Sequence, residues 1–498
     1  MAIKKIFWLI FLFTFVIRII GIDKLTIYPD EITWMVKGKE ALYALKAFNL
    51  DYFRYGWWNS LTDTYAIGWP MVILGGLSHI IFAGAGKFSL HLLSDILSVR
   101  LPEILVSSLI PSVLFYYASQ FLSLEVSLFA ALALSLSPIS MGIDRWFIHD
   151  SFLSLFFLLS MGSYLKSHKE KKVSPLPGIW LALGALTKPL GLIPILGWLA
   201  LFNKKLFISS LVIAFFTIQI LWPQSWIEPV VSYPKYLLRQ LTLVNSGDPI
   251  PNFYFGVSSN SPHWTYYFYE FLIRTPELIL ISFFIGLGLL VTKTRKRIIF
   301  SIILPVIVCL YLLSSSAVKG GIRYLLFLLP FVYLLSSWTI VSFIRRFWVN
   351  RLLIYSLLLI HLAITSFSFY PDFYLYYNTL SGGGEKQKKY ILVSLCYGNK
   401  IALEYLDLNK LEGPTFIFGC QDSGYYHSSR NLTKNFKEAK YLIVESSFVQ
   451  QHPDNQQLIK ALTYFKVIDL YQKNILTASI YQNPLYGLPE VLPAQKVK

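Results

Sequence analysis

Repeated long apolar stretches constrain this chain more than any other feature of its sequence. A membrane-spanning helix needs about 20 predominantly apolar residues. About eleven candidate stretches occur before residue 370, at 6–22, 97–118, 123–141, 146–165, 176–188, 189–202, 206–222, 276–292, 298–316, 323–344 and 352–369. Charged residues make up only 14% of the chain, against about 25% in soluble proteins. We therefore predict an all-α polytopic membrane protein, in which Pro189 breaks the short fifth and sixth stretches into a tilted pair.

The distribution of basic residues predicts how the helices are oriented in a membrane. The formal net charge is +17, but the Lys and Arg side chains cluster in short turns rather than in a compact basic domain, which argues against nucleic acid as a partner. With the N-terminus in the cytoplasm, the inner turns hold about fifteen basic residues. The short outer turns hold only Arg145, Lys188, Lys319 and Arg323. Basic residues are disfavoured on that side, so these four are candidates for function.

The longer polar segments complete the predicted organisation. Residues 23–96 and 223–275 are rich in Trp, Tyr, Pro and Gly, which favours interfacial helices and loops on the outer side. We expect a membrane domain over residues 1–370 and a small extracytoplasmic α/β domain over 371–498, with strands near 415–418, 441–444, 467–471 and 477–481. Cys396 and Cys420 lie in this second domain, where a disulfide and two free thiols are both compatible with the sequence.

Two acidic segments at helix ends could carry chemistry. Asp30 and Glu31 follow the first span, and the pair suits either a helix cap or a general base held near the lipid surface. Asp144, His149 and Asp150 lie at the turn between the third and fourth spans. A carboxylate at membrane depth is costly and suggests function. The alternatives are helix capping with an Asp144–Arg145 surface pair, and a divalent-cation site whose metal the sequence does not identify.

The basic residues of the outer turns suit an anionic headgroup. Lys188 precedes a proline, and it would either snorkel to the interface or contact a phosphate as a point charge. Lys319 and Arg323 flank a Gly-Gly turn, and Arg favours bidentate phosphate recognition. His263 lies among aromatic residues, where a structural role, a nearby metal and an acceptor sugar are all compatible. The sequence places a candidate base and several cations on one side of the membrane, at the ends of apolar helices. A transferase that uses a lipid-linked phosphate donor needs this combination.

The motifs, in their order along the chain, resemble those of GT-C-fold glycosyltransferases, in the branch of protein O-mannosyltransferases and aminoarabinose transferases. The similar segments are Tyr28-Pro29-Asp30-Glu31, Arg100-Leu101-Pro102-Glu103, Ser137-Pro138 with His149-Asp150, Gly184 to Lys188, Arg323-Tyr324 to Pro330, and Tyr377-Asn378 with Gly382-Gly383. The resemblance covers the whole membrane region. It implies a polyprenyl- or dolichyl-phosphate sugar donor and inverting transfer, of a hexose or a pentose, on the outer face.

The resemblance also implies roles for individual residues. Asp30 would be the catalytic base with Glu31 in support, and Asp150 the second acidic position. Lys188 and Arg323 would contact the donor phosphate, with Lys319 and Arg145 as further candidates. His263, His149 and Asp144 would lie near the acceptor or a divalent cation. The C-terminal region lacks the carbohydrate-binding repeat of the eukaryotic mannosyltransferases, so the acceptor is a lipid, a glycan or a protein.

Two alternative functions remain compatible with the sequence. An oligosaccharide or polymer ligase would move a preassembled glycan through a similar site. A lipid or sugar transporter would carry charges near mid-membrane, whereas these charges lie at helix ends. A scaffold without activity is a third reading, against which the intact Asp30 and Asp150 argue.

Overall fold

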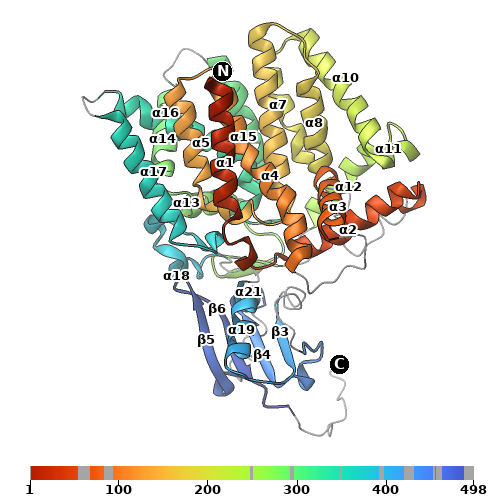
Figure 1. Ribbon diagram of the computed structural model, residues 1–498, viewed down its shortest axis with the longest axis vertical. Helices are drawn as coiled ribbons and strands as arrows, with labels where there is room; N and C mark the ends of the chain where they lie inside the picture. Colours follow the sequence, from red (N-terminus) through yellow and green to blue (C-terminus); the bar gives the residue numbers. More distant parts are fainter. Residues whose placement is uncertain are drawn as a thin grey trace.

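The computed structural model describes residues 2–53, 68–83, 93–246, 251–291, 296–346, 350–391, 397–419, 431–452, 455 and 462–486. Within them, a helical bundle is joined at one end to a smaller unit built around a β-sheet, and the N-terminus lies at the opposite end of the bundle (Figure 1). Cys396 and Cys420 fall outside the described residues, so their pairing stays a prediction.

The predicted apolar stretches coincide with helices of the bundle. These are α1 (Ala2–Ile19), α4 (Leu93–Ala118), α5 (Leu124–Ser135), α7 (Asp150–Glu170), α8 (Leu176–Thr187), α9 (Pro194–Ala200), α10 (Lys204–Leu221), α14 (Glu277–Val291), α15 (Lys296–Ser315), α16 (Leu329–Ile344) and α17 (Arg351–Phe367). Among the described residues, four helical segments are long and apolar enough to cross a membrane, and the other apolar helices are shorter. The chain is thus a membrane protein, and the number of spans stays a prediction.

Prolines interrupt two of the predicted stretches. The stretch 123–141 is not one helix, because α5 ends at Ser135 and a short helix α6 (Pro138–Ile143) begins after Ser137 caps it. The break expected near Pro189 is present: α8 ends at Thr187, and Lys188 is extended before the 3₁₀ turn η3 (Pro189–Leu192). Proline lacks a backbone donor and disfavours helix in the residue before it, so a helix ends before each of these prolines.

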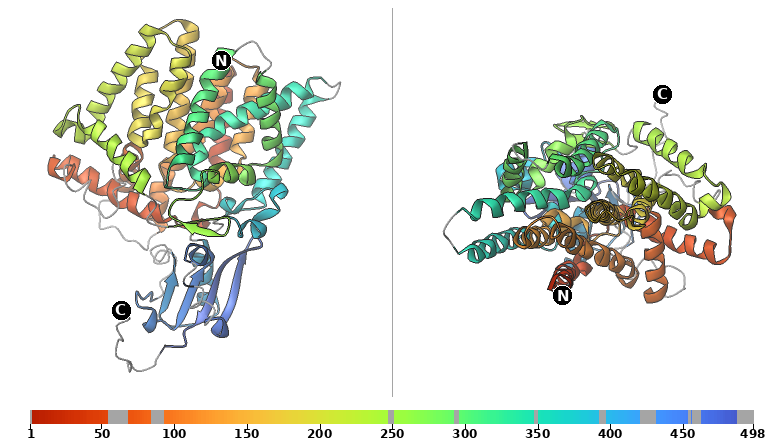
Figure 2. Two further views of the ribbon diagram at one scale, coloured as in Figure 1. Left: turned by 180° about the vertical axis from the view of Figure 1, so that it is seen from behind. Right: turned by 90° about the horizontal axis from the view of Figure 1, so that it is seen from above.

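The two long outer segments contribute helices near the sheet-facing end of the bundle. The first contains the 3₁₀ turn η1 (Ile22–Lys24), α2 (Pro29–Lys46) and α3 (Trp69–Ala83). The second contains α11 (Pro223–Ile227), α12 (Ser232–Ser246), the hairpin β1 (Asn252–Tyr254) with β2 (Val257–Ser259), and α13 (Tyr266–Arg274). The hairpin lies between the bundle and the sheet (Figure 2, left). Its Ser258 donates a hydrogen bond to the Gln451 carbonyl across that junction.

The C-terminal unit has strands over all four predicted segments. They are β3 (Thr415–Phe418), β4 (Tyr441–Glu445), β5 (Lys466–Gln472) and β6 (Ile475–Gln482), in the order β3-β4-β6-β5. β3 and β4 are parallel, while β6 runs antiparallel to β4 and β5. Helices α19 (Tyr397–Leu408) and α21 (Ser446–Gln451) complete the unit. Tyr397 and Ile475 belong to the same buried cluster as the bundle, so the two units pack directly together.

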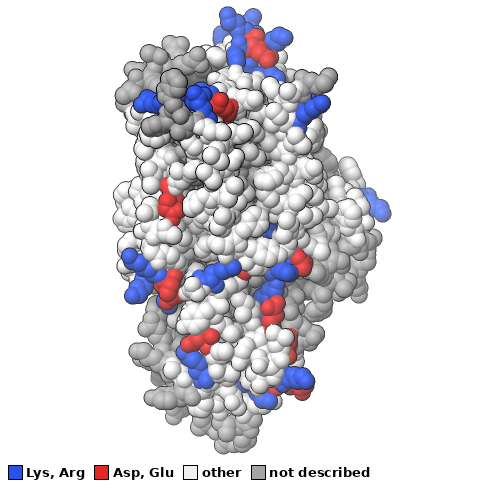
Figure 3. Space-filling view, turned by 60° about the vertical axis from the view of Figure 1, so that its left-hand side comes forward, with Lys and Arg blue, Asp and Glu red and all other residues white. Residues whose placement is uncertain are grey.

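Charged side chains are unevenly distributed over the outer surface. On the face shown in Figure 3 they gather at the end of the bundle far from the sheet and again over the lower half of the molecule, with few charged side chains between. The start of α1, the end of α7 and the start of α10 all lie at the far end, as the alternation of inner and outer turns requires (Figure 1). This pattern suits a bundle surrounded by lipid between two polar layers.

Candidate active site

An ion pair joins the first outer segment to the 3₁₀ helix that precedes α16. Asp30 is the second residue of α2, and its Oδ2 lies 2.8 Å from Nη1 of Arg323 in the 3₁₀ helix η4 (Ile322–Leu328). The Asp30 side chain is 41% exposed, whereas that of Arg323 is 12% exposed. Tyr28, not Asp30, is the N-cap of α2, so the predicted capping role of Asp30 is wrong. The Asp30 carboxylate instead faces Arg323 while staying accessible.

A second, deeper ion pair lies beside the first. Asp150 is the first residue of α7, and its Oδ1 lies 2.5 Å from Nζ of Lys188, with both side chains buried. The Tyr324 ring connects the two pairs, because Lys188 Nζ lies 4.1 Å from its centroid and the Arg323 guanidinium 5.3 Å. The break before Pro189 therefore directs Lys188 inward. The structure thus brings together four predicted residues that come from α2, α7, η4 and the end of α8; we call these four and Tyr324 the charged cluster.

Glu31 supports this cluster from within the protein. Its two carboxylate oxygens accept hydrogen bonds from Arg100 at 2.8 and 2.7 Å and from the backbone N–H groups of Tyr28 and Phe147. Both Glu31 and Arg100 are fully buried. Glu31 therefore fixes the first turn of α2 and has no position open to a substrate. The sequence prediction quoted Arg100 only as part of a motif, although an Arg within an apolar helix is itself a signal of a buried partner.

The turn between α6 and α7 is organised differently from the prediction. Asp144 pairs with Arg18 of α1, Nη2 to Oδ2 at 2.6 Å, and accepts a hydrogen bond from Ser151. Arg145 donates instead to the carbonyls of Ile20 and Pro371. The expected Asp144–Arg145 pair is therefore wrong. The reason is burial: both side chains are inaccessible to water and take partners from different parts of the fold.

Three other predicted site residues make no hydrogen bond to the charged cluster within the described part of the chain: Lys319, His149 and His263. Lys319 Nζ donates to the carbonyls of residues 313, 314 and 316 at the end of α15, and burial lowers its pKa to about 8. His149 is buried, with its ring edge-on to Trp34. His263 is exposed before α13 and hydrogen-bonds Thr265. Within the described ranges, no group of three or more His, Cys, Asp or Glu side chains could hold a metal ion.

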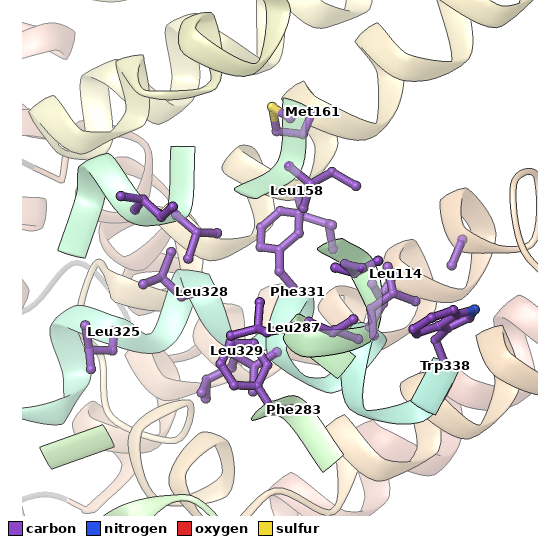
Figure 4. A pocket seen from close by; sticks show the side chains of 18 of the residues that line it. Leu114, Leu158, Met161, Phe283, Leu287, Leu325, Leu328, Leu329, Phe331 and Trp338 are labelled. Atoms are coloured by element: carbon purple, nitrogen blue, oxygen red, sulfur yellow. The ribbon is translucent and has the colours of Figure 1, made fainter. Parts of the chain in front are cut away.

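An apolar cavity of about 630 Å³ lies within the helical bundle. It is lined by α4, α7, α13, α14, α15, η4 and α16, and residues such as Leu158, Leu328 and Phe331 point into it (Figure 4). Leu325, two residues after Arg323, lines the same cavity. Ligand sites typically measure about 300–1,000 Å³. The cavity therefore has room for part of a long hydrocarbon chain.

Comparisons with known proteins bear on part of the sequence and on the overall fold. Residues 87–225 match the family model described as dolichyl-phosphate-mannose-protein mannosyltransferase. No curated protein matches the chain by sequence. The crystal structure of ArnT from Cupriavidus metallidurans bound to undecaprenyl phosphate is similar, with 13% identity, a TM-score of 0.50 and coverage of 97% of this chain and 99% of that chain. The same protein in its apo state has 12% identity and a TM-score of 0.48, over 98% of this chain and 100% of that one.

At such low identity the structural likeness shows a shared fold, while the family match concerns the sequence of residues 87–225. The two observations are independent and point the same way. The chain is thus similar to dolichyl-phosphate-mannose-protein mannosyltransferases over residues 87–225, and its overall fold is similar to that of ArnT.

Proposed function

We propose that this protein transfers one sugar from a polyprenyl- or dolichyl-phosphate donor to an acceptor on the non-cytoplasmic face of the membrane, with inversion at the anomeric carbon. The observation that carries the proposal is that η4 contributes both to the charged cluster, through Arg323 and Tyr324, and to the lining of the apolar cavity, through Leu325. A lipid-linked donor has this same division, since a hydrocarbon chain ends in a phosphate. The structurally similar ArnT was crystallised bound to undecaprenyl phosphate, which favours this class of lipid.

The cations of the cluster would receive the donor phosphate. Arg323 and Lys188 both lie against the Tyr324 ring, and each is already paired with a carboxylate. A phosphate that binds Arg323 would compete with Asp30 for the guanidinium. Donor binding would therefore release the Asp30 carboxylate next to the bound sugar. Asp150 holds Lys188 in place and keeps a buried ammonium compensated until the phosphate arrives.

The freed Asp30 would act as the general base. It accepts the proton of the acceptor's hydroxyl or amine as the acceptor attacks the anomeric carbon of the sugar. A new glycosidic bond forms, the bond from that carbon to the phosphate oxygen breaks, and polyprenyl phosphate leaves with the bonding electrons. Arg323 and Lys188 stabilise the charge that develops on the leaving phosphate. No step requires a metal ion, and we assign Glu31, Arg145, Lys319 and Asp144 to positioning and folding.

The test is turnover of purified protein with defined donors, read by mass spectrometry of the products. Removing a general base costs about 10²- to 10⁴-fold in rate, so Asp30→Asn should lose nearly all transfer. Glu40→Gln is the matched control, because Glu40 is exposed on the same helix and pairs with Lys37 and Tyr52, which are outside the charged cluster. Full activity of Asp30→Asn would remove Asp30 as the base. Movement of the lipid across the liposome membrane without covalent transfer would indicate a transporter and contradict the proposed enzyme.

A further inference from the structure

A continuous set of packed aromatic rings connects the C-terminal unit to the charged cluster. Tyr397 is the first residue of α19, and its ring centroid lies 5.9 Å from that of Trp146. The Trp146 ring lies 4.9 Å from that of Tyr28, whose centroid lies 4.9 Å from Cζ of Arg323. Tyr374 packs against both Tyr397 and Trp146, at centroid distances of 6.0 and 5.1 Å. We call the four rings of Tyr397, Tyr374, Trp146 and Tyr28 the aromatic column.

Hydrogen bonds hold the column against the first outer segment. Trp146 Nε1 donates to the Thr26 carbonyl at 2.9 Å. Lys400, one turn after Tyr397 on α19, donates to the carbonyl of Lys24. The Tyr397 side chain is fully buried and that of Trp146 is 1% exposed. Closely packed interiors transmit displacements, so a shift of α19 would reach the segment that leads into α2.

Arg323 needs this support because its carboxylate partner would leave during the proposed reaction. The Asp30 side chain is 41% exposed, and a donor phosphate would displace it from the guanidinium. Other contacts of Arg323 do not involve Asp30. Its Nε donates to the Gly320 carbonyl at 3.2 Å, and the guanidinium lies against the rings of Tyr28 and Tyr324. A guanidinium over an aromatic face is attracted by the ring quadrupole, so the Tyr28 ring would help to keep Arg323 in place.

We propose that the C-terminal unit positions Arg323 for the donor phosphate through the aromatic column. This inference rests on the proposed function, because it concerns the cation that would bind the phosphate there. Tyr28 is a positioning residue in direct contact with Arg323, and Tyr397 acts through Trp146 and Tyr28. The affinity of the site for a phosphate therefore depends on how α19 packs against the bundle, although α19 contributes no side chain to the charged cluster.

The experiment measures the affinity of the full-length protein in detergent for undecaprenyl phosphate by native mass spectrometry, with donor and acceptor KM values in parallel. Tyr397→Leu removes a ring of the column and should weaken undecaprenyl phosphate binding by about 3- to 10-fold. The donor KM should rise with it, while the acceptor KM stays the same. A loss of folded protein alone would lower kcat and leave both KM values unchanged. Tyr397→Phe should recover most of the lost affinity, because it keeps the ring and removes a hydroxyl that has no hydrogen-bond partner among the described residues.

A double-variant comparison tests whether Tyr397 acts through Tyr28. Tyr28→Leu removes the ring that contacts Arg323 and should weaken binding by about 5- to 30-fold. In that background Tyr397→Leu should weaken binding by less than about 2-fold more, because the column no longer reaches the guanidinium. Losses that simply multiply would overturn the proposed transmission.

The matched control is Tyr405→Leu. Tyr405 lies on the same helix but packs against the buried cluster of the C-terminal sheet, so its removal should leave the affinity unchanged. Equal weakening by Tyr405→Leu and Tyr397→Leu would indicate a general loosening of the C-terminal unit and overturn the proposal, as would wild-type affinity in Tyr397→Leu. Binding of undecaprenyl phosphate without any sugar transfer would refute the proposed reaction alone, because the binding measurements would still test the role of the column. Absence of binding by the wild-type protein would overturn both.

Discussion

The Glu31–Arg100 pair offers the sharpest test of how the site is built. Glu31 accepts four hydrogen bonds, two from Arg100 and two from backbone N–H groups, and both side chains are inaccessible to water. Glu31→Gln keeps the shape of the side chain but removes its charge and turns one acceptor into a donor. The Arg100 guanidinium would then remain buried beside a neutral amide whose N–H groups face other donors.

The expected cost follows from this burial. Breaking a buried ion pair by removing one partner costs about 3–5 kcal/mol, because the remaining charge is uncompensated. The Lys37–Glu40 pair on the same helix is the comparison, with a Glu40 side chain that is 44% exposed. An exposed pair contributes about 0–1 kcal/mol, so Glu40→Gln should change stability by no more than that.

The assay is denaturant unfolding of the purified variants in mixed micelles, with turnover measured in parallel well below the unfolding transition. The double variant Glu31→Gln/Arg100→Met should be more stable than Glu31→Gln alone, since it removes the stranded charge. Turnover of Glu31→Gln should also fall, because Glu31 fixes the turn that carries Asp30. A loss of less than about 1 kcal/mol in Glu31→Gln would refute the reasoning, as would a double variant less stable than the single one.

Two further predictions concern the junction with the sheet and the apolar cavity. Burial raises the pKa of Asp372 to about 6 from an ordinary 3.8, and Lys400 only partly offsets this. The folded state favours the protonated form of Asp372. This preference contributes fully to the free energy of unfolding below about pH 4. The contribution, roughly 3 kcal/mol in total, is lost as the pH rises through about 6. Asp372→Asn should abolish this pH dependence and be more stable at pH 7 in thermal unfolding; an unchanged profile would contradict the assignment. Leu158→Trp, which fills part of the cavity, should raise the KM for the donor at least about 10-fold with little change in stability. The control Leu353→Trp lies on the exposed face of α17, and equal donor KM values for the two variants would exclude the cavity as the lipid site.

Part of the site could be predicted from the sequence, because that part depends on local features such as charge placement and proline chemistry. Lys188 before Pro189 and Arg323 after a Gly-Gly turn are basic residues at positions where a membrane protein avoids them, and both lie in the charged cluster. The break at Pro189 could be predicted from the backbone chemistry of proline alone. Lys319 met the same criterion, yet it caps the end of α15, since charge patterns do not distinguish a ligand contact from a backbone contact.

Pairing between distant residues was decided only by the tertiary structure. Asp30 and Arg323 are 293 positions apart, and Asp144 pairs with Arg18 across 126 positions rather than with its neighbour Arg145. A buried charge must find the opposite charge that packing brings nearest, and that choice depends on how whole helices dock. By itself, the sequence determined the apolar helices, their breaks and the side on which the unusual charges gather, because hydropathy and backbone chemistry act locally. The packed fold decided which of those charges meet.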